Sequence, residues 1–433
     1  MNKKVYIGMA ADLIHPGHIN VIKKGSELGD VIVGLLSDEA IASYKRIPYM
    51  KFEDRKKVIE SIAYVKEVVR QDTLDYTTNI LKFKPEYVLH GDDWKKGVQS
   101  EVRKKVIETL SSYGGELIEI PYTVGISSTA IQKDIKRNGI TPENRRKSLS
   151  DLLEVKPYLK FLDLHTPLSG LVIENVKIVD SDNKINEFDG MWASSLTDST
   201  SRGKPDIEAV DFSSRAITLN EVFEVTTKPL IYDGDTGGKV EHFTFTVKNL
   251  ERLGVSAVVI EDKVGLKRNS LHGTDVEQFQ DDIDKFSEKI SIGKESQTSE
   301  DFMIIARIES LILDKGLDDA KLRAEKYLEA GADGILIHSR KSDGIEIADF
   351  SKYYKKLNID KPLVVVPTSY NQFTENELFT NGANIIIYAN HLLRSSYPAM
   401  IKTANSILEN GRSKEADSDL ISIKEILNLI PGT

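Results

Sequence analysis

Eight short apolar runs recur along the chain from residue 159 onward, and this repeat limits the fold more than any other feature of the sequence. Amphipathic stretches such as Leu317–Ala330 separate most of them. Such alternation is typical of parallel strands joined by helices. Eight strands in about 240 residues predict a (β/α)8 TIM-type barrel, with an open doubly wound sheet as the alternative. The runs are Leu159–Thr166, Gly190–Ser194, Pro229–Asp235, Ala257–Asp262, Phe302–Glu309, Gly334–Ser339, Pro362–Thr368 and Asn384–Asn390.

Polar side chains end four consecutive runs of this repeat, where a barrel builds its active site. For any one of them a plain strand terminus is the commoner reading, but four in succession favour a site. The acidic members suit a hard cation such as Mg²⁺, and we expect Arg307 and His338 to supply positive charge for an anionic substrate. The residues are Asp233 and Asp235, Glu261 and Asp262, Arg307 and Glu309, and His338 and Ser339.

A second strand–helix alternation fills the N-terminal third and predicts a separate α/β domain with a parallel sheet. The polar stretch Lys136–Ser150 contains Gly139 and Pro142 and is the best linker candidate. We therefore expect domains at residues 1–137 and 151–433, joined by a linker at 138–150. The N-terminal strand-like runs are Lys4–Met9, Val31–Leu36, Tyr87–His90 and Glu116–Ile120, and the helical patterns are Ile19–Leu28, Lys56–Val65 and Gln99–Ser112.

Composition narrows the class of protein. A chain of 433 residues is too long for one compact domain. It has no cysteine, which excludes disulfides, thiolate metal sites and thiol catalysis. The net charge of −9 argues against a general nucleic-acid binder, although Met1–Lys147 is net basic and suited to anions. No apolar run is long enough to span a bilayer. We expect a cytosolic enzyme.

The tetrapeptide His15-Pro16-Gly17-His18 follows the carboxyl end of the first N-terminal run. Two imidazoles beside a helix N-terminus can donate hydrogen bonds to phosphate oxygens. Taken alone, the tetrapeptide is also compatible with a surface turn. Further motifs then follow in order over Lys3 to about Ile135: SDE (Ser37–Glu39), EDRKKVIESIAYVKEV (Glu53–Val68), HGDDW (His90–Trp94) and GISSTAI (Gly125–Ile131).

With DLIHPGH (Asp12–His18), these motifs resemble a glycerol-3-phosphate-type cytidylyltransferase, which implies a Rossmann-like nucleotidyltransferase domain. The resemblance assigns His15 and His18 to the α-phosphate of CTP while an acceptor oxygen displaces pyrophosphate. The competing readings are solvated loop charges for Lys45 and Arg46, packing for Trp94 and a plain helix cap for the serines. The residues implied in nucleotide or acceptor binding are Asp12, Lys45, Arg46, Arg55, Asp92, Trp94, Ser127, Ser128 and Thr129.

Two departures from that family's pattern concern the acceptor. Tyr122-Thr123 stands where the family usually has arginine, and Met9-Ala10-Ala11-Asp12 is one residue longer than the usual Thr-Phe-Asp approach. Both lie where the acceptor would bind, so nucleotidyl transfer is better supported than glycerol phosphate as the acceptor.

The segment from about Arg146 to Asn410 carries the motif EDKVGLKRNSLHG (Glu261–Gly273), with WASSL, DGDTGG, ARIES, HSRK and VPTSY around it. These resemble phosphoenolpyruvate mutase of the isocitrate lyase superfamily. The C–C lyases of that superfamily use a catalytic cysteine on the gating loop, and this chain has none. The mutase is therefore favoured over a lyase, while a phosphonopyruvate hydrolase stays open.

The resemblance implies roles for the barrel residues. Asp233, Asp235 and Glu261 organise Mg²⁺, mostly through water. Arg307 and His338 steady the migrating phosphoryl group and the enolate, and Asp206 lies near the phosphoryl group. Lys267, Asn269 and Ser270 belong to a loop that closes over the substrate, flanked by Gly265 and Gly273 as hinges. The residues implied in binding the pyruvyl group are Trp192, Ser194 and Leu196.

Together the two resemblances imply a bifunctional enzyme of phosphonate biosynthesis with phosphoenolpyruvate and CTP as substrates and Mg²⁺ at both sites. The simplest acceptor of CMP is 2-aminoethylphosphonate. A catalytically dead nucleotide sensor is the alternative for the N-terminal domain. Both families usually form oligomers, so we expect a homodimer or tetramer. The helical spacing of Leu420–Pro431 predicts a tail that caps an interface or packs on its own barrel.

Overall fold

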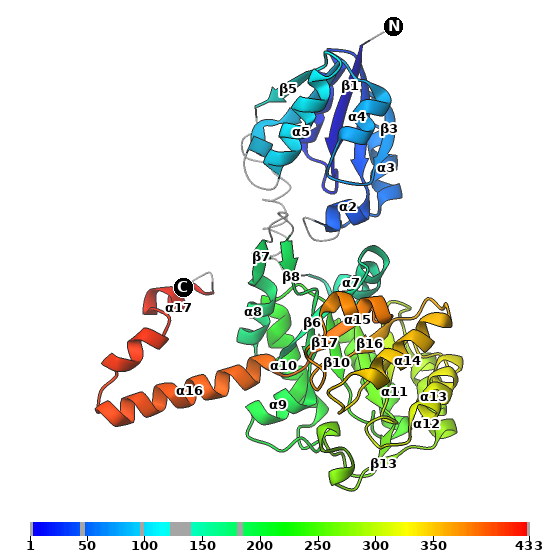
Figure 1. Ribbon diagram of the computed structural model, residues 1–433, viewed down its shortest axis with the longest axis vertical. Helices are drawn as coiled ribbons and strands as arrows, with labels where there is room; N and C mark the ends of the chain where they lie inside the picture. The colour runs from blue at the N-terminus through cyan, green and yellow to red at the C-terminus, as the bar shows by residue number, and fades with distance from the viewer. Residues whose placement is uncertain (1–2, 44–47, 96–98, 122–139, 180–184, 431–433) are drawn as a thin grey trace.

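The computed structural model describes residues 3–43, 48–95, 99–121, 140–179 and 185–430. They form two α/β domains, one with an open parallel sheet and one with a closed barrel (Figure 1). In the described part of the chain, no helix is both long and apolar enough to cross a membrane.

The N-terminal sheet has the strand order β3-β2-β1-β4-β5. From β1 the chain continues to β2 and β3 on one side and then to β4 and β5 on the other, so the strand order reverses between β1 and β4. In sheets of this type, ligands bind at the carboxyl ends of the strands at that point. Helix α1 starts from the end of β1 at this point. The strands are β1 (Lys4–Met9), β2 (Asp30–Leu36), β3 (Val65–Gln71), β4 (Tyr87–Gly91) and β5 (Glu116–Ile120), and the helices are α1 (Pro16–Ser26), α2 (Asp38–Ala42), α3 (Phe52–Glu60), α4 (Thr77–Phe83), the 3-10 turn η1 (Asp92–Lys95) and α5 (Gln99–Ser111).

Strand β3 was not expected from the sequence. The helical pattern assigned to Lys56–Val65 ends five residues early, at Glu60, and the chain then enters β3. This strand lies at the sheet edge, and most of its residues are exposed or only partly buried. Its charged residues hide the apolar signal that marks the inner strands.

The C-terminal barrel closes in the order β10-β11-β14-β15-β16-β17-β6-β9, which confirms the eight predicted runs and excludes the open sheet. Side chains such as Phe161, Trp192 and Ile305 fill its interior, and a larger apolar layer lies between strands and helices. The strands are β6 (Leu159–Leu164), β9 (Gly190–Ala193), β10 (Leu230–Asp233), β11 (Ala257–Glu261), β14 (Met303–Ile308), β15 (Gly334–Ile337), β16 (Leu363–Val365) and β17 (Ile385–Tyr388).

Helices surround the barrel, and small two-stranded sheets decorate it. The helices are α8 (Pro167–Asn175), α9 (Ser195–Ser201), α10 (Phe212–Val225), α11 (Val240–Leu253), α12 (Ile283–Ser296), α13 (Leu317–Glu329), α14 (Ile345–Lys356) and α15 (Glu375–Asn381). The small sheets pair β7 (Lys177–Val179) with β8 (Ile185–Glu187) and β12 (Lys263–Val264) with β13 (Phe279–Gln280).

The predicted linker at 138–150 is wrong over most of its length. Residues from Pro142 onward form helix α7 (Pro142–Val155), which belongs to the barrel. Arg145 on this helix is buried and donates hydrogen bonds to the carbonyl oxygens of Lys228 (3.0 Å) and Thr226 (2.6 Å). The polar composition of the stretch hid a helix whose inward face includes an arginine.

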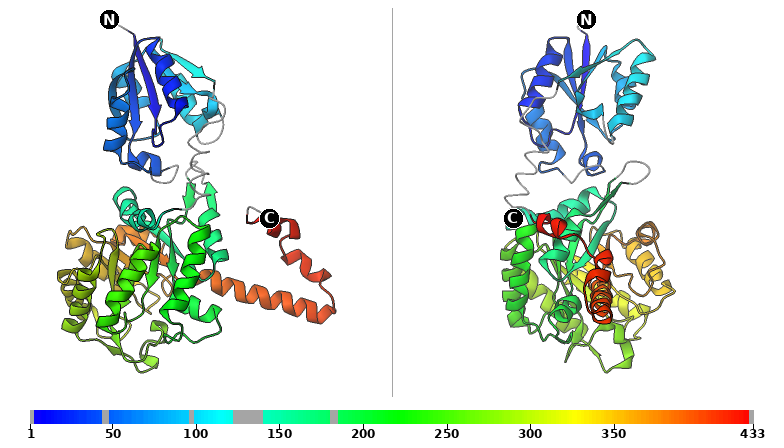
Figure 2. Two further views of the ribbon diagram at one scale, coloured as in Figure 1. Left: turned by 180° about the vertical axis from the view of Figure 1, so that it is seen from behind. Right: turned by 90° about the vertical axis from the view of Figure 1, so that its left-hand side faces the viewer.

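Helix α16 (His391–Asn410) leaves the barrel and projects away from it (Figures 1 and 2). None of its residues is buried. The 3-10 turn η3 (Lys414–Asp419) and helix α17 (Ile423–Asn428) follow, and Ile423 on α17 is 74% exposed. The tail is helical as predicted, but it does not pack on its own barrel.

Candidate active sites

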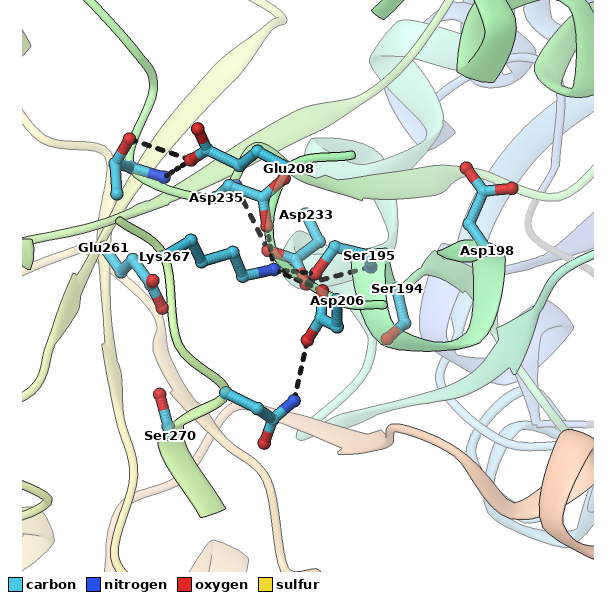
Figure 3. Close-up of polar contacts among 12 residues, drawn as sticks. Ser194, Ser195, Asp198, Asp206, Glu208, Asp233, Asp235, Glu261, Lys267 and Ser270 are labelled. Atoms are coloured by element: carbon cyan, nitrogen blue, oxygen red, sulfur yellow. Dashed lines mark hydrogen bonds and ion pairs between the residues drawn. The ribbon is translucent and has the colours of Figure 1, made fainter. Parts of the chain in front are cut away.

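A pocket opens at the carboxyl ends of the barrel strands, with a volume of about 60 Å³. It unites the barrel residues to which the resemblance assigns roles, except Asp235, which pairs with Lys267 (Figure 3). Three further strand-end residues expected at the site, Asp262, Glu309 and Ser339, do not line it. The predicted residues that line it are Trp192, Ser194, Leu196, Asp206, Asp233, Glu261, Lys267, Asn269, Ser270, Arg307 and His338.

The side chain of Lys267 ends inside an acidic cluster (Figure 3). Its ammonium group donates a hydrogen bond to Asp206 (2.7 Å) and forms a close ion pair with Asp235. It also contacts the hydroxyl of Ser195. Asn269 Nδ2 donates to the other oxygen of Asp206 at 2.8 Å. These contacts hold the Lys267–Ser270 segment over the pocket.

The far end of the same segment is held by a second group of charges. The hydroxyl of Ser270 donates to Glu309 (2.5 Å) and accepts from Arg307 (2.6 Å) and Lys263 (3.0 Å). Lys263 also lies 3.2 Å from Glu261. All these side chains are buried or nearly so, so each charge depends on its neighbours for compensation.

Burial and neighbouring charges set the protonation of this site. Burial raises the pKa of Glu261 to about 7, against the opposing charges of Arg307 and Lys263. Burial would also raise the pKa of Glu309, but Arg307 and Lys263 lower it to about 2. Burial and the adjacent Arg307 lower the pKa of His338 to about 4. His338 is therefore neutral at pH 7, which corrects the prediction that it supplies positive charge.

The carboxylates of Asp233, Asp235, Glu261 and Asp206 are hard oxygen donors of the kind that Mg²⁺ prefers. Among the described residues, no group of three acidic or imidazole side chains converges closely enough to hold a metal ion directly. A Mg²⁺ ion here would use few protein oxygens and keep several waters. The donor set fits the ion, and the Lys267 ammonium already lies among these carboxylates.

The two glycines that flank the closing segment have left-handed backbone conformations. Gly265 has φ +84° with open space around it, and Gly273 has φ +50°. A Cβ atom on Gly273 would lie 2.0 Å from the guanidinium of Arg340. Both positions favour glycine, as the predicted hinges require.

In the N-terminal domain, His15 and His18 lie at the start of helix α1 with ring centroids 4.0 Å apart. The Nδ1 atom of His15 accepts from the Gly17 amide (3.1 Å), and that of His18 accepts from the His15 amide (3.4 Å). A neutral imidazole that accepts at Nδ1 carries its proton on Nε2. Both rings can therefore donate from Nε2 to a phosphate oxygen.

Asp12 and Arg55 support the chain beside these histidines. Asp12 accepts hydrogen bonds from the amides of Tyr49 (2.6 Å) and Met50 (3.2 Å). Arg55 is fully buried, and its donors go to Asp38 and to the carbonyls of Met50 and Ala10. The structure thus contradicts direct phosphate contact by Arg55, because its guanidinium is committed to the protein.

Trp94 also differs from its predicted place. It is 1% exposed, stacks on His90 with centroids 3.9 Å apart, and donates to Glu119 at 2.9 Å. It packs in the domain core, the competing reading of this residue. Asp92 begins the turn η1 and is partly buried. Lys45, Arg46, Ser127, Ser128 and Thr129 lie outside the described residues.

Sequence reasoning assigned no role to three residues of the barrel site. Ser195 donates both its amide (3.1 Å) and its hydroxyl (2.9 Å) to Asp233. Lys263 stands inside the quoted EDK motif, which could have marked it. Arg215, from helix α10, lies behind the acidic cluster, and nothing in the helical pattern around it distinguishes it from a surface charge.

Two parts of the chain match two different known families. Residues 149–408 match the model of the phosphoenolpyruvate phosphomutase family, and residues 6–134 match the cytidylyltransferase-like model. A phosphoenolpyruvate phosphomutase of Tetrahymena pyriformis is 32% identical over 65% of this chain and 89% of its own length. A phosphonopyruvate hydrolase of Variovorax sp. (strain Pal2) is 37% identical over 56% of this chain and 83% of its own length.

Solved structures of the same two kinds of enzyme are similar to this chain. The crystal structure of a phosphoenolpyruvate phosphomutase from Streptomyces platensis subsp. rosaceus has a TM-score of 0.60 at 31% identity, covering 65% of this chain and 93% of that one. The structure of a phosphonopyruvate hydrolase complexed with oxalate and Mg²⁺ has a TM-score of 0.58 at 31% identity, covering 67% and 95%. In both comparisons the fraction of this chain that is covered is about the fraction that the barrel domain occupies.

Proposed function

Because the chain belongs to the phosphoenolpyruvate phosphomutase family, we propose that its barrel interconverts phosphoenolpyruvate and phosphonopyruvate. The reaction breaks the bond between phosphorus and the enol oxygen and forms a bond between phosphorus and the methylene carbon. No water enters and no proton is gained or lost overall. The observation that carries the proposal is the closed Lys267–Ser270 segment over a pocket that unites Arg307 with the three carboxylates of Asp206, Asp233 and Glu261.

Each group has a task in this reaction. The turn that holds Ser194 and Leu196 offers backbone groups to the pyruvyl oxygens, and Arg307 compensates the charge of the phosphoryl group. His338, neutral at pH 7, donates or accepts a hydrogen bond without adding charge. A bound Mg²⁺ would supply positive charge to the pyruvyl oxygens. The closed segment excludes water, which a metaphosphate-like transition state requires if it is not to be hydrolysed.

A phosphonopyruvate hydrolase is the second candidate, because a relative of that name is 37% identical. The two activities differ in whether water reaches the phosphoryl group. The chain is incubated with phosphonopyruvate, Mg²⁺, NADH and lactate dehydrogenase. If the chain releases pyruvate, lactate dehydrogenase oxidises NADH at once. If the chain is a mutase, its product is phosphoenolpyruvate, and NADH is oxidised only after pyruvate kinase and ADP are added to convert that product to pyruvate. NADH oxidation without pyruvate kinase would contradict the mutase proposal.

For the N-terminal domain we propose transfer of CMP from CTP to a phosphonate, with 2-aminoethylphosphonate as the simplest acceptor. Support comes from the match to the cytidylyltransferase-like model and from the two Nε2 donors of His15 and His18 at a helix N-terminus. Phosphonopyruvate leads to this acceptor by decarboxylation and transamination on other chains. Mg²⁺ would accompany CTP at this second site.

Pyrophosphate release from CTP across a panel of phosphonates and phosphate esters tests the acceptor. Turnover of 2-aminoethylphosphonate supports the proposal, and turnover of glycerol phosphate alone would contradict it. The variant His18→Ala separates an enzyme from a nucleotide sensor. We expect it to lose CMP transfer while the barrel reaction is unchanged, whereas a sensor would have no CMP transfer to lose.

We also propose a homo-oligomer, a dimer or tetramer, formed by exchange of helix α16. This helix exposes Tyr397, Met400, Ile401 and Leu408 along one face, and this apolar face has no partner in a single copy of the described chain. A charge on that face, Tyr397→Glu, should shift the mass measured by light scattering toward the monomer. Ser406→Glu, on the opposite face, is the matched control. A cytosolic location stays a prediction.

A further inference from the structure

A single buried guanidinium joins the ends of two neighbouring barrel strands. Arg215 on helix α10 is 5% exposed. Its Nη2 donates to the carbonyl of Ala193 at the end of β9 (3.1 Å), and its Nη1 donates to the carbonyl of Asp233 at the end of β10 (2.7 Å). Nε donates to the carboxylate of Asp198 on helix α9 (3.1 Å).

These two strand ends carry the binding groups of the pocket. The residues directly after Ala193 are Ser194, Ser195 and Leu196, and Asp233 begins the Asp-Gly-Asp turn. Ser195 already bridges the two turns through its hydrogen bonds to Asp233. Arg215 fixes the same spacing from behind, through main-chain atoms that cannot change rotamer.

Arg215 also orients a carboxylate of the acidic cluster. Asp235 has φ +54°, a left-handed conformation that needs support from its surroundings. One of its oxygens lies 3.5 Å from Nη1 of Arg215, and the other pairs with Lys267. The carboxylate is thus held between a fixed cation behind it and the ammonium of the closing segment in front.

The contacts at position 215 fit an arginine side chain and not a lysine. The guanidinium lies over the ring of Tyr232 at 4.0 Å and spreads its donors over three elements. A lysine ammonium keeps the charge but is a point donor and cannot span two carbonyls and a carboxylate. Arg215→Lys therefore changes geometry while leaving the local charge unchanged.

We propose that Arg215 is a positioning residue that sets the spacing of the Ser194–Leu196 and Asp233–Asp235 turns and so forms the cation site of the barrel. The inference rests on the proposed function of the barrel but concerns cation binding, which is measured without turnover. The competing view is that Arg215 stabilises the fold and nothing more.

Arg145 provides a matched control for that view. It is equally buried and stacks on Phe223 at 4.1 Å. It also donates to main-chain carbonyls, those of Thr226 and Lys228, but from helix α7 next to the start of β10. Arg145→Lys and Arg215→Lys should therefore lower the melting temperature by similar amounts, while only Arg215→Lys alters the pocket.

The test is a MgCl2 titration of the full chain without nucleotide. The chain has two tryptophans, Trp94 and Trp192. In a Trp94→Phe background the remaining indole, Trp192, lines the pocket and reports on it by fluorescence. We expect Arg215→Lys to weaken Mg²⁺ binding at least tenfold and Arg145→Lys to change it less than twofold.

Equal Mg²⁺ affinities in the two lysine variants would overturn the proposal, as would the absence of any Mg²⁺ response in the unsubstituted background. If Arg215→Lys does not fold, Asp198→Asn replaces it, since this change removes the charge that anchors Nε of Arg215; it also weakens the pairing of Asp198 with Arg202 (2.9 Å), so Arg202→Gln, which removes that second pairing alone, is its control. We expect about a threefold weakening for Asp198→Asn, and unchanged affinity would also overturn the proposal. A chain that binds Mg²⁺ as expected but converts no substrate would contradict the proposed function and leave this inference standing.

Discussion

Replacing Lys267 by methionine removes the ammonium group that lies among Asp206, Asp235 and Ser195. Without a divalent cation, the buried carboxylates then lose a main source of compensation. Removal of one partner from a buried ion pair costs about 3–5 kcal/mol. A domain of this size loses roughly 2–4 °C per kcal/mol, so the melting temperature in EDTA should fall by about 6–20 °C.

The same variant should bind Mg²⁺ more tightly. A unit charge about 4–5 Å from this divalent ion repels it by roughly 7–8 kcal/mol at an effective dielectric constant of 20. Even after partial screening, we expect at least tenfold tighter Mg²⁺ binding. Phosphoryl transfer should nevertheless fall by about 10²–10³-fold, because an electrostatic contact to the reacting group is lost.

Scanning fluorimetry with EDTA or with MgCl2 measures the stability change, and the coupled assay measures turnover. Lys228→Met is the control, since Lys228 is also a buried lysine but pairs with Glu187 away from the pocket. That variant should lose the same stability with and without Mg²⁺. The electrostatic account of the pocket is refuted if Lys267→Met shows no loss in EDTA, or if it binds Mg²⁺ more weakly than the unsubstituted chain.

Three smaller changes test other contacts. Ser270→Ala removes the hydroxyl shared by three charged side chains, so turnover should fall at least tenfold and pyruvate should begin to appear in the lactate dehydrogenase assay. Gly273→Ala strains a left-handed residue and should slow loop closure, seen as a lower kcat with a stability loss of about 1 kcal/mol. Burial would raise the pKa of Glu187, but the charges of Lys228 and Lys177 lower it to about 2. Its contribution is therefore complete above about pH 4.5 and is lost as the pH falls through about 2. Glu187→Gln should accordingly cost about 1–2 kcal/mol in urea unfolding at pH 7 and much less at pH 2.

The barrel could be predicted from the sequence because its strands are buried on both faces and read as continuous apolar runs. Each predicted run contains one observed strand, and the ends overrun by a few residues because the polar site residues follow directly. The same logic failed for β3, whose charged residues face solvent at the sheet edge. It failed for α7 because Arg145, a buried residue, looks like surface in a sequence.

For the sites, too, some residues could be predicted from the sequence and others could not. Residues in motifs, such as Lys267 and Arg307, were predicted and are brought together. Arg55 and Trp94 were assigned to ligand contact, but a sequence cannot show that their polar groups are already satisfied inside the domain. Arg215 could not be found, since its role arises only when α10 packs behind β9 and β10.

The most direct test of the central proposal is a ³¹P NMR spectrum of phosphonopyruvate incubated with the full chain and MgCl2. Equilibrium favours the phosphate ester, so we predict that the phosphonate resonance is replaced by that of phosphoenolpyruvate. A resonance of inorganic phosphate growing in its place, with no phosphoenolpyruvate, would contradict a barrel that moves the phosphoryl group without water.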